Sequence, residues 1–177
     1  MKKLKIEELN RVSPEAYANI PKLRFTVVLD NVRSLNNIGS VFRTSDAFLV
    51  EKICLCGISA TPPSPEIHKT ALGAEDTVLW EYYEDTVSAI EKLKKENYTV
   101  FSVEQTQNSI FLSRLELDKN KNYAVVFGNE VRGVQQSVVD ICHGSIEIPQ
   151  FGTKHSLNVS VAAGIVIWLF FSVLKDV

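Results

Sequence analysis

The most informative part of this chain is the stretch Ile148-Pro-Gln-Phe-Gly-Thr-Lys-His-Ser-Leu-Asn-Val-Ser-Val-Ala-Ala-Gly164. A loop of small, hydrogen-bonding residues leads directly into an apolar segment, with Ser156 and Asn158 at the junction. A helix that begins in this way presents unpaired backbone N–H groups and short polar side chains to whatever lies in front of it. We therefore expect a binding site that is joined to a core helix.

The apolar segment runs for 19 residues, from Ser156 to Leu174, without a charge. That is long enough to span a bilayer, so a C-terminal membrane anchor is one interpretation. Ser156, Asn158 and Ser160 open the run, however, and leave only about four strongly apolar turns. Because a helix that is apolar all round also suits the centre of a domain or of a dimer, we favour a buried helix and expect no membrane.

The composition is typical of a soluble globular protein, with 45 % apolar and 23 % charged residues. A chain of 177 residues most simply forms one domain, which buries about 70 % of its unfolded surface. The formal net charge of −2 does not indicate a nucleic-acid partner. It does not exclude one, because binding needs only a local basic patch.

Three cysteines, an odd number, argue against a disulfide framework and favour a reducing cytoplasm. Cys54 and Cys56 have the wrong spacing for a zinc ribbon, and no second ligand pair follows them, so we expect buried cysteines and no metal. The lysine-rich N-terminus is not followed by an apolar signal region, so we do not expect export.

Strands and helices alternate along the chain. Apolar, β-branched runs predict strands at 25–30, 52–57, 77–83, 98–104, 123–127 and 145–148, and helical periodicity predicts helices at 36–48, 85–95 and 134–141. A proline-rich loop at 61–65 leads to Lys69–Ala74. The alternation indicates an α/β fold with a mainly parallel sheet flanked by helices, formed by a single domain over 23–177 after a short lead-in over 1–22.

Three loops that follow predicted strands are rich in polar residues: Asn31–Arg43, Gly128–Gly133 and Pro149–Asn158. In such folds ligands bind where loops leave the carboxyl ends of the strands. We therefore expect the three loops to form one site.

The loop Gly128–Gly133 has two glycines around Glu130, and glycine lets the backbone approach a ligand or adopt positive φ. It matches neither the phosphate loop nor the dinucleotide fingerprint. Taken alone, it is equally consistent with a plain turn and an exposed Glu130. Arg43 lies on a polar helix face with Asn36 and Ser40, where it suits a phosphate or a hydroxyl, although a solvated arginine is the alternative.

Taken together and in this order, the three motifs resemble those of the SpoU (TrmH-like) branch of the SPOUT RNA methyltransferases. The matching segments are Asn37–Arg43, Gly128–Gly133 and Pro149–Ala162, and the likeness spans about residues 25–170. The resemblance implies S-adenosylmethionine as methyl donor and a ribose 2′-hydroxyl of RNA as acceptor. It also implies a C-terminal trefoil knot, which general topology rules disfavour, and a homodimer.

Site residues follow from the resemblance position by position. The catalytic set is Asn37, Arg43, Glu130, Ser156 and Asn158; the cofactor-binding set is Phe127, Gly128, Asn129, Glu130, Gly133, Ile148, Pro149, Ser156 and Leu157. The family's small-residue loop that ends in Gly-Ala corresponds to Lys69–Ala74. Neither set implies a metal.

The chemistry of the reaction suits these residues. A sulfonium methyl group is already electrophilic, so the enzyme mainly has to align oxygen, methyl and sulfur and to help the hydroxyl proton leave. Because a guanidinium is essentially always protonated, we expect Arg43 to stabilise the developing alkoxide, with Asn37 and Glu130 orienting it and with water or an RNA phosphate accepting the proton.

The RNA is less well defined by the sequence. We favour tRNA, because a compact folded RNA can be bound through shape and phosphates without a separate module. The alternatives are an rRNA 2′-O-methyltransferase and a catalytically silent RNA-binding relative. The basic residues available for contact are Lys2, Lys3, Lys5, Arg11, Lys22, Arg24, Arg33, Lys119 and Lys121.

We expect the homodimer to form through the last helix, whose apolar residues include Ile165, Ile167, Trp168, Phe170 and Phe171.

Overall fold

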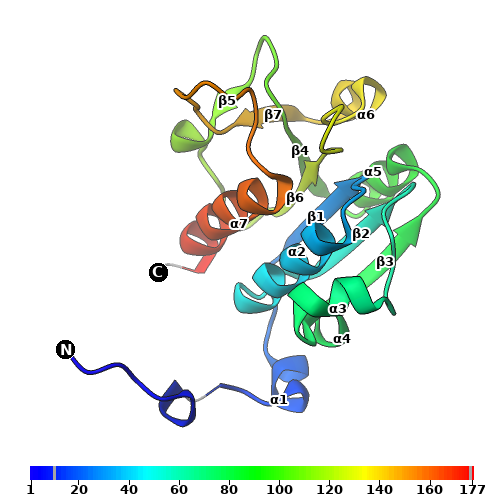
Figure 1. The fold of residues 1–177 in the computed structure, drawn as a ribbon. Helices are drawn as coiled ribbons and strands as arrows, with labels where there is room; N and C mark the ends of the chain where they lie inside the picture. Colours follow the sequence, from blue (N-terminus) through cyan, green and yellow to red (C-terminus); the bar gives the residue numbers. More distant parts are fainter. Residues whose placement is uncertain (10, 176) are drawn as a thin grey trace.

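The computed structural model describes residues 1–9, 11–175 and 177. Its strands are β1 (Phe25–Asp30), β2 (Lys52–Cys56), β3 (Leu79–Tyr83), β4 (Tyr98–Val103), β5 (Ile110–Phe111), β6 (Asn122–Phe127) and β7 (Gly144–Glu147). All of these strands pair in parallel within one seven-stranded sheet, in the order β3-β2-β1-β6-β4-β7-β5 (Figure 1). The expectation of an α/β fold with a parallel sheet is therefore confirmed.

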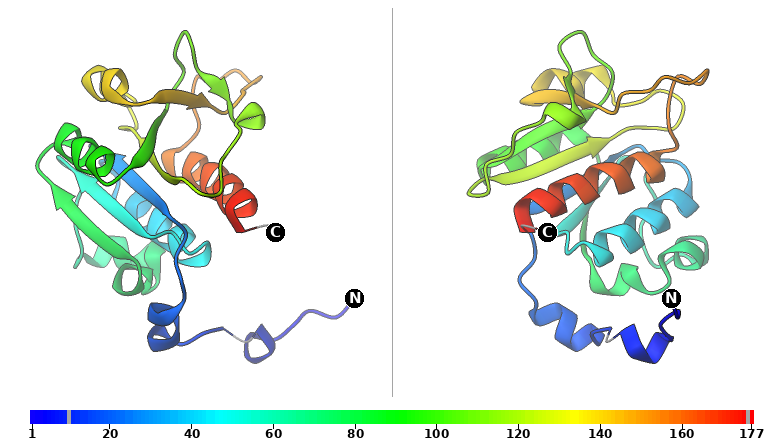
Figure 2. Two further views of the ribbon diagram at one scale, coloured as in Figure 1. Left: turned by 180° about the vertical axis from the view of Figure 1, so that it is seen from behind. Right: turned by 90° about the vertical axis from the view of Figure 1, so that its left-hand side faces the viewer.

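The helices cover both faces of this sheet (Figures 1 and 2). They are α1 (Pro14–Asn19), α2 (Leu35–Ala47), α3 (Pro65–Ala71), α4 (Ala74–Thr77), α5 (Thr86–Lys95), α6 (Gln136–Ile141) and α7 (Val159–Lys175), with 3-10 turns η1 (Ile6–Leu9) and η2 (Leu112–Arg114). One core cluster joins alternate residues of the central strands to α2, α3 and α7, and a second joins the opposite residues to α5 and α6.

Burial on both faces explains the composition of the central strands. Every residue of β1 is buried, and Val27 pairs with Ile53 on one side and Val125 on the other. A strand that is covered on both faces reads as a continuous apolar run, which is why the sequence pattern located β1 and β6 correctly.

The segment after β2 differs from expectation. Lys69–Ala71 belong to helix α3 and not to a loop, and a further short helix, α4, delays the start of β3 from residue 77 to Leu79. Pro65 occupies the first turn of α3, where proline is well tolerated, and the Ser64 hydroxyl caps that helix by accepting from the Ile67 N–H at 3.5 Å. The proline-rich segment 61–65 therefore contains the start of a helix as well as a loop.

The N-terminal segment extends away from the body of the protein (Figures 1 and 2). Helix α1 is attached by Tyr17, which is buried and whose hydroxyl donates to the backbone oxygen of Asp46 at 3.2 Å. The sequence pattern did not identify α1 or the two-residue strand β5.

Helix α7 is buried along one side only. Ile167 and Phe170 are fully buried, and the Phe170 ring stacks on Phe25 with centroids 4.5 Å apart. Those two residues are therefore part of the protein's own core, and the expectation that they contribute to an interface is wrong.

Among the described residues, no helix combines the length and the apolar character needed to cross a membrane. The trefoil knot stays a prediction.

Helices α2 and α3 pack unusually closely at Gly39, which is buried. A Cβ atom at this position would lie 2.2 Å from Thr70 Oγ1 and 2.3 Å from the Ile67 carbonyl oxygen. The second of these atoms is backbone, so it cannot move without displacing α3.

We predict that Gly39→Ala lowers the free energy of unfolding by about 1–3 kcal/mol, because overpacking outweighs the better helix propensity of alanine. Urea denaturation followed by circular dichroism measures this difference. The neighbouring Ser40→Ala, at a half-buried position of the same helix, should stay within about 0.5 kcal/mol of wild type. Equal stability of the Gly39→Ala variant and wild type would show that the close packing of α3 against α2 leaves room for a methyl group.

Candidate functional site

The strand order brings the polar loops together. Strands β1, β6, β4 and β7 are consecutive in the parallel sheet, so their carboxyl ends lie along the same edge. A cavity of about 670 Å³ opens there, between the loops that follow β4, β6 and β7 and the start of α7.

Most of the predicted site residues line this cavity. They are Phe127, Gly128, Asn129, Glu130, Gly133, Ile148, Ser156, Leu157 and Asn158. Pro149, Asn37 and Arg43 are not among the lining residues. Lys69–Ala74, which span the end of α3, the turn after it and the first residue of α4, are also absent from the lining.

The loop after β6 has a fixed shape. Asn129 and Gly133 exchange two backbone hydrogen bonds of 3.0 and 2.9 Å, and the Asn129 side-chain oxygen accepts from the N–H groups of Val131 and Arg132. Gly133 has a φ of 67°, and a Cβ on Gly128 would lie 2.1 Å from the backbone of Gly133. Both glycines are therefore required by the backbone geometry, as the sequence suggested.

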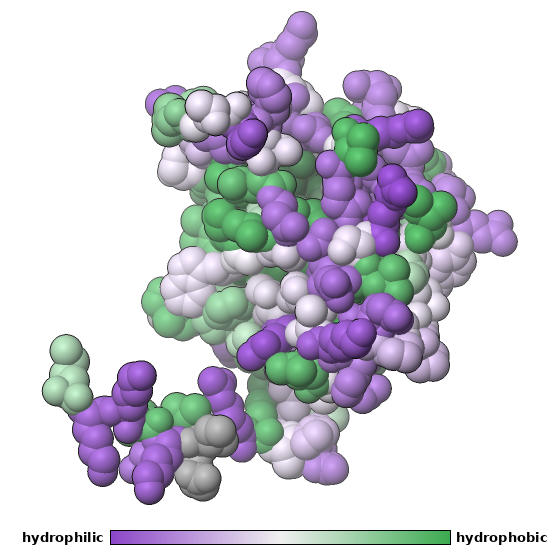
Figure 3. Space-filling model, viewed as in Figure 1, coloured by the Kyte–Doolittle hydropathy of each residue, from purple (hydrophilic) through white to green (hydrophobic). Residues whose placement is uncertain are grey.

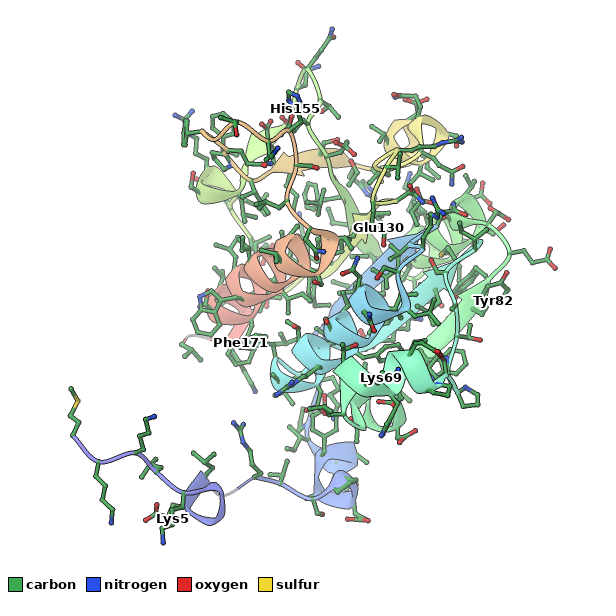
Figure 4. All side chains as sticks on the ribbon, in the orientation of Figure 1. Lys5, Lys69, Tyr82, Glu130, His155 and Phe171 are labelled. Carbon is green, nitrogen blue, oxygen red and sulfur yellow. The ribbon has the colours of Figure 1, made fainter. Side chains whose placement is uncertain are left out.

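The carboxylate of Glu130 joins this loop to the start of α2. It accepts hydrogen bonds from the backbone N–H groups of Arg33 and Ser34, at 3.0 and 2.9 Å, and from the side-chain amide of Asn37 at 3.1 Å. The start of a helix also favours a negative charge. In Figure 4 the labelled Glu130 lies where the loop after β6 meets the first turns of α2 and α7.

These contacts change the acidity of Glu130. Partial burial by itself raises the pKa of the carboxyl group, but hydrogen bonds from Arg33, Ser34 and Asn37 outweigh it, so the pKa lies below its usual value. Glu130 is consequently ionised at neutral pH and its oxygen atoms are already occupied by donors.

Asn158 extends the same network to α7. Its amide donates to Asn37 Oδ1 at 3.1 Å, while its own Oδ1 accepts from the backbone N–H of Ser160 at 2.8 Å and from the Ser160 hydroxyl at 2.6 Å. Asn158 thus caps α7, as the junction in the sequence predicted. Glu130, Asn37 and Asn158 together connect three segments that are far apart in the chain.

Arg43 and Ser156 lie outside this network. Arg43 is exposed on α2, six residues and about 9 Å of helix axis beyond Asn37, and it makes no hydrogen bond or ion pair with any described residue. Ser156 is exposed at the cavity. The structure therefore does not bring Arg43 to Asn37 and Glu130 within one chain.

The sequence pattern missed the contribution of the loop after β4. Glu104, Gln105 and Thr106 line the cavity, and so does His155 in the loop before α7 (labelled in Figure 4). The predicted strand at 98–104 includes Glu104 as its last residue, whereas β4 ends at Val103. The available signal is a run of three polar residues, Glu104, Gln105 and Thr106, directly after the apolar end of a predicted strand. Within the described part of the chain, no group of His, Cys, Asp or Glu is arranged to hold a metal ion.

Comparison with known proteins identifies relatives of this chain. The model of a family described as the SpoU rRNA Methylase family matches residues 24–168. A tRNA (guanosine(18)-2′-O)-methyltransferase from Thermus thermophilus is 32 % identical over 143 residues, which cover 81 % of this chain and 72 % of that protein.

Solved structures share the fold of this chain. A TrmH/SpoU tRNA modifying enzyme from A. aeolicus superposes with a TM-score of 0.81 at 24 % identity, covering 92 % of this chain and 81 % of that one. An AdoMet-bound rRNA methyltransferase from Sinorhizobium meliloti gives 0.79 at 26 % identity, over 93 % of this chain and 62 % of that one.

We predict that Glu130→Gln lowers the free energy of unfolding by about 1 kcal/mol at pH 7, because the glutamine amide faces backbone N–H groups that need an acceptor. The lowered pKa of Glu130 stabilises the folded state above the ordinary value of 4.5, and this contribution is lost as the pH falls through the folded-state pKa. Urea melts at a series of pH values should therefore show the two proteins converging below about pH 4.5.

The matched control is Glu116→Gln, at an exposed carboxylate outside the network. It should leave the stability unchanged at every pH. A constant difference between wild type and Glu130→Gln down to pH 2 would contradict the role given to the ionised carboxylate.

Proposed function

Because the chain belongs to the SpoU rRNA methylase family, we propose that it transfers the methyl group of S-adenosylmethionine to a ribose 2′-hydroxyl of RNA, with tRNA as the favoured substrate. The observation that carries the proposal is a hydrogen-bond network in which Asn37 of the first motif joins Glu130 and Asn158, the residues of the other two motifs that line the cavity. The similarity to a tRNA 2′-O-methyltransferase over 81 % of the chain supports the reaction and the choice of RNA.

The cavity fits the cofactor. Its volume of about 670 Å³ is within the range of roughly 300–1,000 Å³ typical of small-molecule sites. Apolar side chains such as Ile146, Ile148 and Leu157 suit a planar base, and the surrounding loops offer backbone groups for its polar edges. The AdoMet bound by the Sinorhizobium relative supports the same assignment. We propose that the loops around Gly128, Ile148 and Leu157 bind it.

The bound cofactor supplies a methyl group that is electrophilic without a metal. The protein then has to hold the ribose hydroxyl in line and to stabilise its developing charge. We assign the second task to Arg43 and the shaping of the pocket to Ser156 and Asn158. Asn37 and Glu130 act by fixing the start of α2, the helix that carries Arg43.

We propose that the active form is a homodimer. Helix α7 exposes Val161, Ile165 and Trp168, at 51, 40 and 48 % of their surface. Figure 3 shows hydrophobic side chains gathered over this part of the molecule. The Trp168 ring lies 5.4 Å from that of Phe48, at the end of α2, so a dimer formed through α7 would also bring the exposed face of α2 into the interface. Arg43 lies on that face and would act there.

RNA contact is assigned to basic residues at exposed positions. Arg33 and Arg132 are exposed in the segments next to Glu130, and Lys154 is exposed in the loop before α7. These residues suit phosphates close to the reacting ribose.

We propose that the catalytic domain spans residues 23–177, a range supported by the family match over 24–168. We also propose that the protein is located in the cytoplasm. The three free cysteines are compatible with that location.

We predict transfer of labelled methyl from S-adenosylmethionine to unmodified total tRNA, recovered after alkali as a methyl-ribose dinucleotide. Ribosomal RNA in a parallel reaction should stay unlabelled. Arg43→Ala should lower kcat by about 10²–10³, as expected for loss of a group that stabilises transition-state charge. Arg43→Lys should also be impaired, because it keeps the charge but loses the planar fork.

Other outcomes have defined meanings. Label in ribosomal RNA alone would keep the reaction and reject tRNA. Binding of the cofactor without transfer to either RNA would favour a catalytically silent relative. Near-normal turnover of Arg43→Lys would reject the role given to the guanidinium.

We predict that Trp168→Asp gives monomeric or insoluble protein, because a charge would be placed in an apolar interface. Sedimentation velocity measures the oligomeric state. Leu79→Asp is the control, since Leu79 is 70 % exposed on the edge strand β3 and should leave the assembly unchanged. A soluble, active dimer from Trp168→Asp would refute the interface.

A further inference from the structure

A polar segment directly after β4, Glu104-Gln105-Thr106, lines the cavity but belongs to none of the three motifs that define the family resemblance. The backbone N–H of Glu104 donates to the Ile146 carbonyl oxygen at 3.1 Å, which fixes the segment against β7. The backbone of Glu104 is therefore fixed at the end of the sheet, and its side chain points toward the loop after β6.

The Glu104 carboxylate accepts two backbone hydrogen bonds. Oε2 accepts from the N–H of Val134 at 3.0 Å, and Oε1 accepts from the N–H of Gln105 at 2.9 Å. Val134 immediately follows Gly133, the last residue of the Gly128–Gly133 loop. Glu104 thus holds the end of the same loop whose middle is held by Glu130.

The contact between Glu104 and this loop is very close. A Cβ atom on Gly133 would lie 2.2 Å from Glu104 Oε2, and Gly133 also has a φ of 67°. Only glycine allows the carboxylate to lie against this backbone while the loop turns back toward Asn129. The shape of the loop and the position of the carboxylate therefore depend on each other.

A longer contact connects the same segment to the loop before α7. The Gln105 side-chain amide donates to the His155 carbonyl oxygen at 3.5 Å. Both residues line the cavity. The segment after β4 consequently touches the two loops that are proposed to bind the cofactor.

We propose that Glu104 is a positioning residue for cofactor binding, which holds the Gly128–Gly133 loop in its binding shape through Val134 and Gly133. The inference rests on the proposed function, since it names a further residue of the same cofactor site. A carboxylate is needed because both of its partners are N–H donors. A glutamine offers one oxygen acceptor, and its amide group would face the other N–H.

Glu104→Gln tests the proposal. Calorimetric titration with S-adenosylmethionine and with S-adenosylhomocysteine should show Kd values about tenfold higher than wild type, as expected for loss of a hydrogen bond to a charged group. The KM for S-adenosylmethionine should rise similarly, while kcat at saturating cofactor and the KM for RNA stay within about twofold, since the variant removes only uniform binding. Glu116→Gln, at an exposed carboxylate, is the matched control.

Two results would overturn the proposal. One is an unchanged Kd for both ligands in a folded Glu104→Gln protein. The other is a loss of kcat and of RNA binding as large as the loss of cofactor affinity, which would indicate a general structural role. If wild type itself binds no cofactor, the proposed function fails; if wild type binds and Glu104→Gln binds equally well, only the role of Glu104 fails.

Gly133→Ala is an independent test, because it keeps the Glu104 carboxylate but places a methyl group where one of its oxygens lies. It should weaken cofactor binding, whereas Gly144→Ala should not, because Gly144 lies at the start of β7 outside the cavity and an added Cβ would be in ordinary contact with Phe101 at 3.5 Å. The loss caused by Gly133→Ala should be smaller in a Glu104→Ala background, where room exists for the methyl group. The strain of positive φ is common to both backgrounds and cancels. Unchanged binding by Gly133→Ala, or strictly additive losses, would overturn the proposal.

Discussion

The ionised carboxylate of Glu130 is the interaction on which the site depends. It accepts hydrogen bonds from two backbone N–H groups before α2 and from Asn37, and Asn37 in turn accepts from Asn158 at the start of α7. Residues nearly a hundred positions apart are held together in this way. Without this carboxylate, the N–H groups of Arg33 and Ser34 would have to form hydrogen bonds with water instead. The network therefore assembles the site before any ligand is present.

The sheet makes this network possible. Because β1, β6, β4 and β7 are parallel neighbours, their loops leave from one edge, and the loop after β6 lies between the start of α2 and the segment after β4. Glu130 holds the middle of that loop and Glu104 holds its end. Gly128 and Gly133 allow the backbone to turn tightly between these two points. The cavity is therefore bounded by a loop whose shape is fixed from both sides.

The sequence predicted those parts of the fold that a local pattern specifies. Strands β1 and β6 are continuous apolar runs, and Asp85 caps α5 as expected, its Oδ1 accepting from the Ser88 N–H at 2.8 Å. Helix α3 was missed because Pro65 is compatible with both a loop and a first helical turn. Of the residues predicted for the site, Glu130 and Asn158 line the cavity, and Asn37 is joined to both by hydrogen bonds. Glu104 was not, because its partners are backbone groups of a distant loop, and no sequence pattern records such a contact.

The hydrogen bonds of Glu130 also restrict what it can do in the reaction. Its oxygens are occupied by N–H donors, and its pKa is lowered, so it is a poor base for a ribose hydroxyl. Asn158 is similarly engaged, with its oxygen bound to Ser160 and its amide to Asn37. These residues therefore contribute by holding α2 and α7 in place. The guanidinium of Arg43 forms no hydrogen bond with the described residues, and it is the motif group that we propose stabilises the developing charge. Because Arg43 lies outside the cavity of its own chain, this proposed role needs either movement of RNA toward α2 or a second chain packed against it.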